Sequence, residues 1–444
     1  MATVAAAAAS STAAPERTFV RDLPKQIGQR VVVHGWLAGL RRARTLRFLT
    51  VRDRSGAVQA VYRDAENPAL LDAMTPESAV RVIGTVGEPA NARFGSTEIE
   101  VESIELVAAA RAPLPLDGGA EPESRLDHRH LDLRPRDRFL VFEVQTTLEL
   151  AIREYVLARG FVEIHSPKIS GGGSESGATV FEVPYFGQSA CLVQSPQFYM
   201  QMAMAAGFDR AFEIGPVFRN EPGATPRHAT EFTIAHFELS WIESHEDLMD
   251  LEEDLLRYAL SVVQDVHGAD IERHCGIAVE VPPEGIPRIP LSEAPGLTGQ
   301  ELGEGGRLLG RAEQALCKYA KEQEGHSFVF LTNYPAADRP FYTMREGELE
   351  SRSFDLLWRG IELTSGGQRE HRHELLRAQT IDAGMDAVTL RRYLEPYFLE
   401  MFRYGCPPHG GFGIGVNRLL MALLAQQSIR ETSFVFRGPG RFVP

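Results

Sequence analysis

The sequence lacks the features of a membrane-spanning or exported chain. None of its apolar runs approaches the length needed to cross a bilayer. Its alanine-rich start has neither the basic segment nor the continuous apolar core of a signal peptide. The four cysteines are far apart, with no Cys-x-x-Cys spacing, at Cys191, Cys275, Cys317 and Cys406. We therefore expect reduced thiols in or near the core of a cytoplasmic protein.

An excess of positive charge is also missing. The chain has 46 Lys and Arg against 60 Asp and Glu, a net charge of −14, which argues against coating nucleic acid by bulk electrostatics. A local basic strip can still act within an acidic whole, and residues 41–48 carry four arginines around Phe48. With 444 residues, 43% of them hydrophobic and 24% charged, the chain is typical of a globular protein with two or more domains.

The first part of the chain has the pattern of a small β-barrel. Residues 1–15 are small and polar and predict a disordered tail. Within 16–108, five β-type runs are separated by turn residues, at 31–36, 48–53, 58–62, 80–86 and 99–104. An OB-fold fits this pattern, and such folds bind single-stranded nucleic acid by aromatic stacking and basic loops. Prolines and glycines then predict a linker or hinge at 109–135.

The remainder mixes helices and strands, which indicates an α+β fold. Apolar residues at helical spacing predict a helix over 138–159 that ends at Gly160, followed by a strand over 161–167. A second helix is expected over 246–266, where Ser244 and Asp247 can form a capping box. Its acidic residues are expected to form a solvated face. Residues 270–306, rich in Pro, Gly and Glu, have the composition of an insertion.

Three segments carry groups that can neutralise a triphosphate. They are Phe218-Arg219-Asn220-Glu221, Arg227-His228-Ala229-Thr230-Glu231-Phe232 and Gly413-Ile414-Gly415-Val416-Asn417-Arg418. Arginine suits this work because its planar fork holds phosphate oxygens at fixed geometry and keeps its charge. Phe232 could stack on a nucleobase, and Glu362 and Ser365 could hold a hard cation through oxygen atoms. Together these groups indicate an ATP site.

These segments resemble motifs 2 and 3 of the class II aminoacyl-tRNA synthetases. Four further runs look like the aspartyl-tRNA synthetases of archaeal and eukaryotic type, with asparaginyl-tRNA synthetases as close relatives: residues 194–199, 353–357, 366–372 and 404–412. The resemblance covers about 17–444. It implies an OB-fold anticodon-binding domain at 16–108 and a class II catalytic domain at 136–444, built on an antiparallel sheet flanked by helices. The helix at 138–159 and the strand ending at Pro167 would form motif 1 and a homodimer interface.

The resemblance implies ATP-dependent activation of aspartate to aspartyl-adenylate, followed by transfer to tRNA(Asp), tRNA(Asn) or both. Arg219, Glu221 and Arg418 would be catalytic, with Arg219 bridging the α-phosphate and the amino-acid carboxylate. Phe232 and Arg418 would sandwich adenine. Mg²⁺ would be held by Glu362 and Ser365, with Glu238 as a third candidate. The full set expected at ATP is Arg219, Asn220, Glu221, Arg227, His228, Ala229, Phe232, Glu362, Gly415, Val416, Asn417 and Arg418.

For the amino acid, Glu175 follows the glycine run 171–173 in a loop that resembles one whose Glu receives the α-ammonium group. Gln197 would assist it, and Arg369 would grip the side-chain carboxylate. The set expected at the amino acid is Glu175, Gln197, Met200, Arg219, His236, Ser365 and Arg369. In the barrel, Phe48 is by propensity a core residue of a strand, whereas the resemblance implies that it stacks on an anticodon base beside Arg47.

The sequence departs from the aspartyl pattern at three positions. Met200 replaces a Lys that helps to bind the substrate carboxylate, His236 replaces an Asp of the same charged network, and Arg47 replaces a Gln beside the stacking Phe48. A protonated His236 would restore a cation and keep aspartate as substrate. Alternatively, the pocket prefers a neutral side chain such as that of asparagine, or the product serves an acceptor outside translation. A non-catalytic binding protein is the least expected, because Arg219, Glu221, Glu362 and Arg418 are all present.

Overall fold

The protein is described by a computed structural model that divides into two compact units, Met1–Phe139 and Leu140–Pro444. The described residues are 16–43, 46–63, 70–71, 73–88, 95–116, 119–174, 180–223, 225–303, 310–385 and 390–443. The expected tail at 1–15 lies outside them. Among the described residues, no helix is long and apolar enough to cross a membrane. All four cysteines lie outside any disulfide, and three of them are buried.

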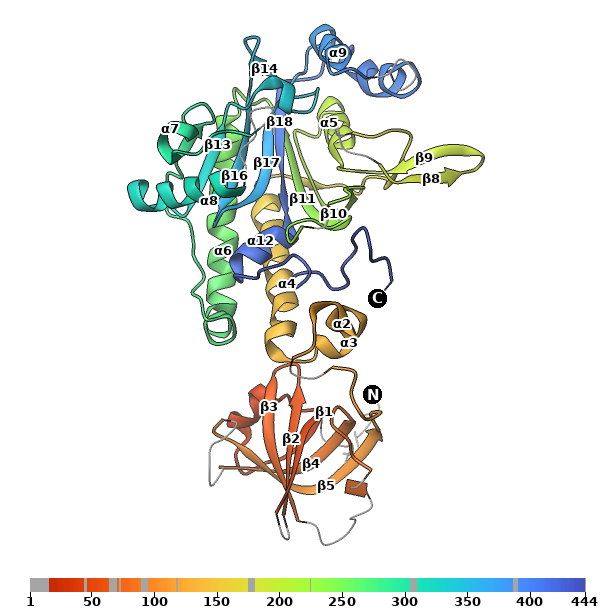
Figure 1. The fold of residues 1–444 in the computed structure, drawn as a ribbon, viewed down its shortest axis with the longest axis vertical. Helices are drawn as coiled ribbons and strands as arrows, with labels where there is room; N and C mark the ends of the chain where they lie inside the picture. Colours follow the sequence, from red (N-terminus) through yellow and green to blue (C-terminus); the bar gives the residue numbers. More distant parts are fainter. Residues whose placement is uncertain are drawn as a thin grey trace, which may run out of the picture. The chain divides into compact units, whose positions relative to one another are not determined.

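The first unit is a closed barrel with the strand order β1-β2-β3-β5-β4 (Figure 1). The strands are β1 Arg30–Ala43, β2 Leu46–Asp53, β3 Gly56–Arg63, β4 Ala79–Gly87 and β5 Glu98–Ala108. Buried and partly exposed residues alternate along β4 because successive side chains point to opposite faces of a strand. At Gly84 a Cβ would lie 2.2 Å from the carbonyl oxygen of Glu100, so glycine lets the neighbouring strand approach. The five expected strands and the OB-fold are confirmed.

The segment expected as a linker, 109–135, contains two short helices, α2 Pro122–Asp127 and α3 Arg129–Asp132. The Asp132 carboxylate accepts a hydrogen bond from Arg125 Nε at 2.7 Å, and the two arginines 125 and 129 lower the pKa of Asp132 against the effect of its burial. Arg134 Nη1 lies 2.8 Å from the Glu77 carboxylate, which also pairs with Arg52. The end of this segment is therefore fastened to the barrel of its own unit.

The second unit is built on an eight-stranded sheet with the order β12-β13-β16-β17-β18-β11-β10-β6. Its strands are β6 Val162–Glu163, β10 Arg210–Phe218, β11 Glu231–Ser240, β12 Arg288–Pro290, β13 Phe328–Thr332, β16 Ser353–Trp358, β17 Ile361–Arg369 and β18 His409–Gly415. The pairs from β13 to β10 are antiparallel, as expected, but β12 and β6 pair in parallel with their neighbours. The sheet is therefore mixed at both edges.

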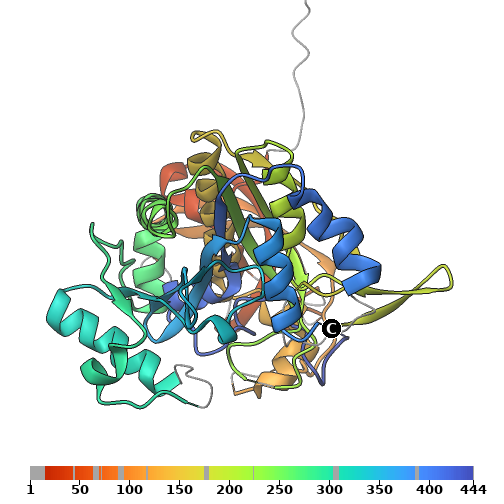
Figure 2. The same ribbon diagram turned by 90° about the horizontal axis from the view of Figure 1, so that it is seen from above.

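Helices and short strands surround the sheet. The helices are α4 Arg136–Leu157, α5 Gln197–Ala205, α6 Glu246–Cys275, α7 Ala294–Thr298, α8 Gly310–Tyr319, η3 Ala320–Glu324, η4 Ala336–Asp338, α9 His373–Asp382, η5 Leu390–Leu399, α11 Glu400–Phe402 and α12 Val416–Leu423. The short strands are β7 Ile169–Ser170, β8 Glu182–Tyr185, β9 Gln188–Leu192, β14 Arg345–Glu346 and β15 Glu350–Ser351. The β8–β9 hairpin projects from the unit (Figures 1 and 2), with Phe186 92% exposed at its tip.

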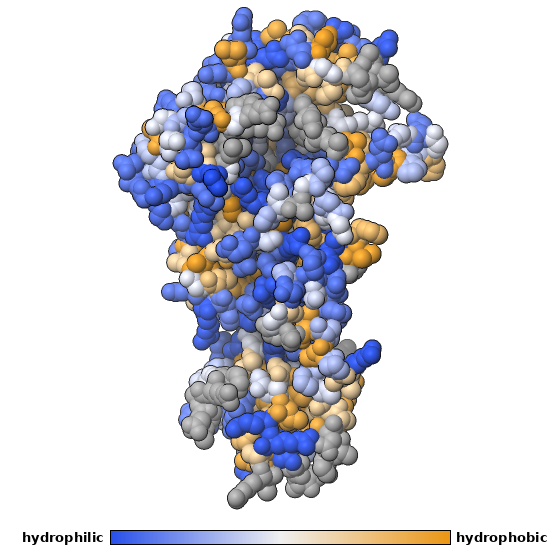
Figure 3. Space-filling model, viewed as in Figure 1, coloured by the Kyte–Doolittle hydropathy of each residue, from blue (hydrophilic) through white to orange (hydrophobic). Residues whose placement is uncertain are grey.

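One face of the sheet holds the main core, and the other carries polar side chains of the central strands. Ala235, Phe237 and Leu239 of β11 pack with apolar residues of α4, α6 and α12. The residues between them, His236 and Glu238, must point to the opposite face because of the period of two. The visible surface of this unit is mostly hydrophilic, with smaller apolar areas (Figure 3).

Helix α6 differs from its expected form. Half of the expected capping box is present, since the Asp247 carboxylate accepts the Ser244 N–H at 3.1 Å. The Ser244 hydroxyl accepts the N–H of Glu246 instead, and the residue at the N-cap is His245. The helix continues to Cys275, beyond the expected end at 266, and Gly276 closes it with φ of 72°. Its acids do not all form a solvated face, because Glu252 and Glu253 are buried.

The segment 270–306 is partly ordered structure, because it includes the end of α6, strand β12 and helix α7. The Glu253 carboxylate anchors its middle by accepting the N–H groups of Gly285 at 2.7 Å and Ile286 at 3.0 Å. The region expected as a strand over 161–167 is shorter than its pattern, since β6 includes only Val162–Glu163. Gly160, expected to follow the first helix, adopts φ of 79°.

Candidate active site

A cavity of about 450 Å³ lies on the polar face of the central strands. Its walls come from β11, β17, β18, the starts of α5 and α12, the segment 219–229 that follows β10, and residues 337–343. Among its lining residues are Ile234 and His236 of β11, which alternate with the core residues of that strand. The fold thus brings residues from 195 to 429 to one hollow.

Most of the expected site residues meet in this cavity: Gln197, Arg219, Glu221, Arg227, His228, Ala229, Phe232, His236, Glu362, Ser365, Arg369, Gly415, Asn417 and Arg418. Asn220, Val416, Met200 and Glu238 are not among its lining residues. Val416, the first residue of α12, is fully buried in the main core. Glu175 lies outside the described residues.

Arginines gather at one end of the cavity. Arg418 Nη1 donates to a Glu362 carboxylate oxygen at 3.2 Å, and its Nε donates to the carbonyl of Arg227 at 3.2 Å. The guanidinium carbon of Arg219 lies 5.5 Å from the centroid of the Phe232 ring. Arg219 Nε is buried without a hydrogen-bond partner among the described residues. This end therefore offers fixed cations and an aromatic face to an anionic nucleotide.

His228 contributes a hydrogen-bonding group to this end instead of a charge. Its Nδ1 contacts the Thr225 hydroxyl, and its Nε2 lies 3.7 Å from the Glu221 carboxylate. Burial, and then the charge of Arg418, lowers the pKa of His228 below its usual 6.5. The ring is therefore mostly neutral at pH 7, and the arginines supply the positive charge of this end.

Two residues that the sequence analysis did not select, Arg339 and Asp355, lie beside Glu362 and Ser365. Asp355 lies opposite Ser365 in the β16–β17 pair, and its carboxylate is 2.8 Å from Arg339 Nη2. Arg339 Nη1 donates to the Ser365 hydroxyl at 2.8 Å. Burial, followed by the charge of Asp355, raises the pKa of Glu362. Two crowded carboxylates beside a hydroxyl form an oxygen set that suits a hard cation.

Glu238 does not belong to this group. It lies opposite Gly411 of β18, which in turn lies opposite Gly367 of β17. Glu362 is five residues from Gly367 along the strand, a distance of about 16 Å at the usual rise of a strand. Burial favours the neutral form of Glu238, but the Arg369 guanidinium, helped by His236, lowers its pKa to about 2. It is therefore an ionised partner of Arg369, and the structure argues against it as a metal ligand.

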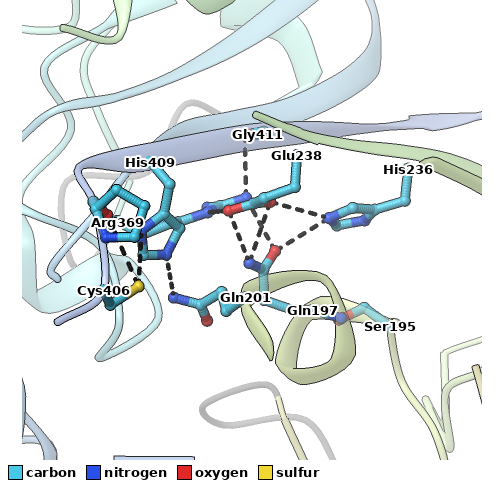
Figure 4. Close-up of polar contacts among 10 residues, drawn as sticks. Ser195, Gln197, Gln201, His236, Glu238, Arg369, Cys406, His409 and Gly411 are labelled. Atoms are coloured by element: carbon cyan, nitrogen blue, oxygen red, sulfur yellow. Dashed lines mark hydrogen bonds and ion pairs between the residues drawn. The ribbon is translucent and has the colours of Figure 1, made fainter. Parts of the chain in front are cut away.

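Arg369 lies at the centre of a buried polar network (Figure 4). It donates to the Glu238 carboxylate at 3.2 Å, to Gln197 Oε1 at 2.9 Å and to the carbonyl of Gly411 at 3.0 Å. Gln197 Nε2 donates in turn to both oxygens of Glu238 at 3.3 Å. A Cβ at Gly411 would lie 2.2 Å from the Glu238 carboxylate, so glycine is required there. The network fixes the Arg369 guanidinium at the second end of the cavity.

His236 extends this network with one free atom. Its Nε2 lies 3.1 Å from Gln197 Oε1, which already accepts from Arg369, so Nε2 is the donor of this bond. Its Nδ1 is buried without a hydrogen-bond partner among the described residues, and the residue lines the cavity. A ligand side chain at this end can therefore form a hydrogen bond with Nδ1.

Comparison with known proteins identifies the family of the chain. Residues 121–436 match the model of tRNA synthetases class II (D, K and N), and residues 31–107 match the OB-fold nucleic acid binding domain. The chain belongs to the class II tRNA synthetases. The two matches leave only short stretches of the chain uncovered, so they account for both units.

Similar proteins cover almost all of this synthetase. The aspartate–tRNA(Asp/Asn) ligase of Aeropyrum pernix is 40% identical over 94% of this chain and 96% of its own length. The ligase of the same name from Thermus thermophilus is 39% identical over 96% and 100%. Among solved structures, asparaginyl-tRNA synthetase from Pyrococcus horikoshii with asparaginyl-adenylate has a TM-score of 0.86 and 29% identity, over 97% of this chain and 100% of that one.

Met200, one of the departures from the aspartyl pattern, lies outside the lining of the cavity. It is fully buried and packs with Ala203, Met204 and Ala211. A charged pair that the sequence analysis did not select lies close to His236, because Glu213 is its partner in the β10–β11 register. Lys168 and the hydroxyl of Ser166 both contact the Glu213 carboxylate. His236, and not Met200, is therefore the departure that faces the ligand space.

His409 supports the network of the synthetase without reaching the cavity. Its Nδ1 donates to the carbonyl of Pro407 at 2.8 Å, so its Nε2 accepts from Gln201 Nε2 at 3.1 Å (Figure 4). Burial lowers the pKa of His409, which agrees with this neutral form. The ring links α5 to the turn before β18 and holds that turn in place.

In the barrel unit of the synthetase, Arg47 and Phe48 lie at the start of β2. Phe48 is half-buried and is not part of the barrel's core cluster, so it is not the core residue that strand propensity suggests. The guanidinium of Arg41, its partner across β1 and β2, lies 4.4 Å from the centroid of its ring. Arg42 lies opposite Arg47. The strip thus places arginines around a reachable aromatic ring.

Proposed function

We propose that this synthetase activates aspartate with ATP and transfers the aspartyl group to tRNA. The observation that carries the proposal is a single cavity with nucleotide-binding arginines at one end and a fixed Arg369 at the other. The relatives named as aspartate–tRNA(Asp/Asn) ligases support it over nearly the whole chain. The acceptor is tRNA(Asp), tRNA(Asn) or both, since both aspartate–tRNA(Asp/Asn) ligases and aspartate–tRNA(Asp) ligases are similar to this chain.

The proposed reaction is attack of the amino-acid carboxylate on the α-phosphate of ATP. Both reactants are anionic, so catalysis depends on positioning and charge neutralisation. Arg219, whose Nε has no partner among the described residues, bridges the α-phosphate and the carboxylate. Arg227 and Arg418 hold the outer phosphates, and Phe232 contacts adenine. Glu221 stays with His228 beside them.

We assign Mg²⁺ to the Glu362 and Ser365 end, with Asp355 beside them. The carboxylates and the hydroxyl fit a hard cation, which commonly takes one or two carboxylates and the phosphates of its substrate. When bound, the ion offsets negative charge on the phosphates. Arg339 keeps Ser365 and Asp355 in place through a hydrogen bond to the Ser365 hydroxyl and an ion pair with the Asp355 carboxylate.

At the amino-acid end, Arg369 binds the side-chain carboxylate of aspartate, and Gln197 and Glu238 hold its guanidinium. Glu175, in the loop after the glycine run, is proposed to receive the α-ammonium group. Asparagine is the second candidate, because the ionised Glu238 already balances the charge of Arg369. The open Nδ1 of His236 could also accept an amide N–H. The similar fold of the solved asparaginyl-tRNA synthetase also supports asparagine as the second candidate.

Amino-acid-dependent exchange of pyrophosphate into ATP, measured across a panel of amino acids with and without tRNA, tests the proposal. Aspartate should support the fastest exchange, and labelled aspartate should appear on tRNA(Asp), tRNA(Asn) or both. Faster exchange with asparagine would move the assignment to the second candidate. Exchange without charging of any host tRNA would favour an acceptor outside translation. No exchange with any amino acid would refute adenylation.

Three further parts of the proposal concern the barrel, the assembly and the compartment. The barrel unit at 16–108 binds the anticodon through Phe48 and Arg47, and the enzyme works in the cytoplasm. The chain forms a homodimer through motif 1. Exposed apolar residues near β6 and the ends of α4, β10 and β11 support this contact, namely Leu157 at 52%, Val162 at 45%, Phe208 at 43% and Trp241 at 72% exposed.

A further inference from the structure

The guanidinium of Arg227 is held by two segments that come much later in the sequence. Its Nη1 donates to a carboxylate oxygen of Glu313 at 2.6 Å and to the carbonyl of Gly360 at 3.1 Å. Glu313 belongs to α8, 86 residues later, and Gly360 lies in the turn between β16 and β17, 133 residues later. The motif 2 arginine therefore depends on a helix to which the sequence analysis assigned no chemistry.

Two glycines allow this close contact. A Cβ at Gly310, the first residue of α8, would lie 2.8 Å from Arg227 Nη2. Gly360 adopts φ of +71°, and a Cβ there would lie 2.5 Å from the Gln314 side chain of α8. Without these glycines, the helix and the turn could not close on the guanidinium in this geometry.

The contacts use one edge of the guanidinium and leave the other. Nη1 has two hydrogens, and it donates one to the carboxylate of Glu313 and the other to the carbonyl of Gly360. No hydrogen bond from Nε or Nη2 to any described residue is present, and Arg227 lines the cavity with Arg418 and His228. The Nε–Nη2 edge can present two parallel N–H groups, the arrangement that arginine uses for phosphate.

We propose that Glu313 is a positioning residue that orients Arg227 for the outer phosphates of ATP. The proposal rests on the adenylating function proposed above and adds α8 to its nucleotide site. Glu313 acts through Arg227 and does not itself contact the phosphates. Charge alone predicts the opposite effect, because a carboxylate near a polyanion repels it, so removing Glu313 would then tighten ATP binding. The sign of the effect therefore separates positioning from simple electrostatics.

The test is binding of MgATP and of AMP to the full-length protein by calorimetry, without amino acid or tRNA. Glu313→Ala should weaken ATP binding about tenfold, as expected for loss of one hydrogen bond to a charged group. AMP binding should not change, because AMP has no outer phosphates. Glu313→Gln keeps an acceptor oxygen and should fall between wild type and Glu313→Ala. Glu322→Ala, at a nearby side chain that is 58% exposed, is the matched control and should bind both like wild type.

Two additional variants complete the test. In an Arg227→Ala background, Glu313→Ala should not weaken ATP binding further, since the residue that it positions is gone. Gly310→Ala should weaken ATP but not AMP binding by crowding Nη2, and it keeps the idea testable if Glu313→Ala does not fold.

Unchanged or tighter ATP binding by Glu313→Ala would overturn the proposal, and so would equal losses for ATP and AMP, which would mean a general disturbance of the site. If wild type binds ATP and supports aspartate-dependent exchange, and Glu313→Ala binds ATP equally well, this inference alone would be overturned. A wild type that binds no ATP would overturn the proposed function as well.

Discussion

Glu252 should make the catalytic unit less stable as the pH rises. It lies on the core side of α6 and is fully buried. Neither carboxylate oxygen makes a regular hydrogen bond among the described residues, although the Thr364 hydroxyl is close. Burial outweighs the effect of Thr364 and raises the pKa of Glu252 from 4.5 to about 8. The folded protein therefore keeps this group protonated at neutral pH.

The sign of the effect follows from the difference in pKa between the folded and the unfolded chain. Below pH 4.5 the group is protonated in both states and costs nothing. Between pH 4.5 and about 8 the unfolded chain ionises while the folded unit does not, so the free energy of unfolding falls. Above that range the loss is complete, at about 5 kcal/mol from the usual value of one pKa unit. Stability from this source is thus lost as the pH rises.

Glu252→Gln removes the titration and keeps the size of the side chain. Its melting temperature should match that of wild type most closely near pH 5 and exceed it at pH 9 by roughly 10 °C, from the usual relation between free energy and melting temperature. Differential scanning calorimetry at several pH values measures this difference. Asp254→Asn, at a side chain that is 56% exposed on the same helix, is the control and should follow wild type. Parallel pH profiles for wild type and Glu252→Gln would refute the reasoning.

Three other predictions concern the proposed function. Arg219→Ala should slow pyrophosphate exchange by about a hundredfold or more, the usual loss on removing one charge-stabilising donor, and near-normal exchange would contradict its role. Phe48→Ala should weaken tRNA charging by about 1–3 kcal/mol, the usual value of a stacking platform. Its exchange rate without tRNA should stay at the wild-type level, and a loss there would show a wider defect. Light scattering should find a wild-type dimer and a weaker one for Trp241→Asp; a wild-type monomer at micromolar concentration would exclude the motif 1 interface.

Local patterns predicted much of the fold. The five barrel strands follow from alternation and turn residues, which are short-range properties of a strand. The start of α6 follows from Ser244 and Asp247 for the same reason. Its end did not follow, because packing against the core and the contacts of Glu253 with Gly285 and Ile286 act over long distances in sequence. Strand β12 was missed on similar grounds, since three residues carry no visible period. Strand β6 lies within the expected strand 161–167, but its short length and its parallel pairing with β10 were not predicted.

The sequence by itself determined the family and most of the residues that meet in the cavity, because motifs 2 and 3 are short contiguous runs whose chemistry can be read in order. Only the tertiary structure decided what each residue does beside its neighbours. Strand register separates Glu238 from Glu362 and gives it to Arg369, while it brings Asp355 beside Ser365. Helix packing places Met200 in the core and Glu313 against Arg227. Register and packing depend on contacts between distant segments, and a linear pattern of residue types does not contain them.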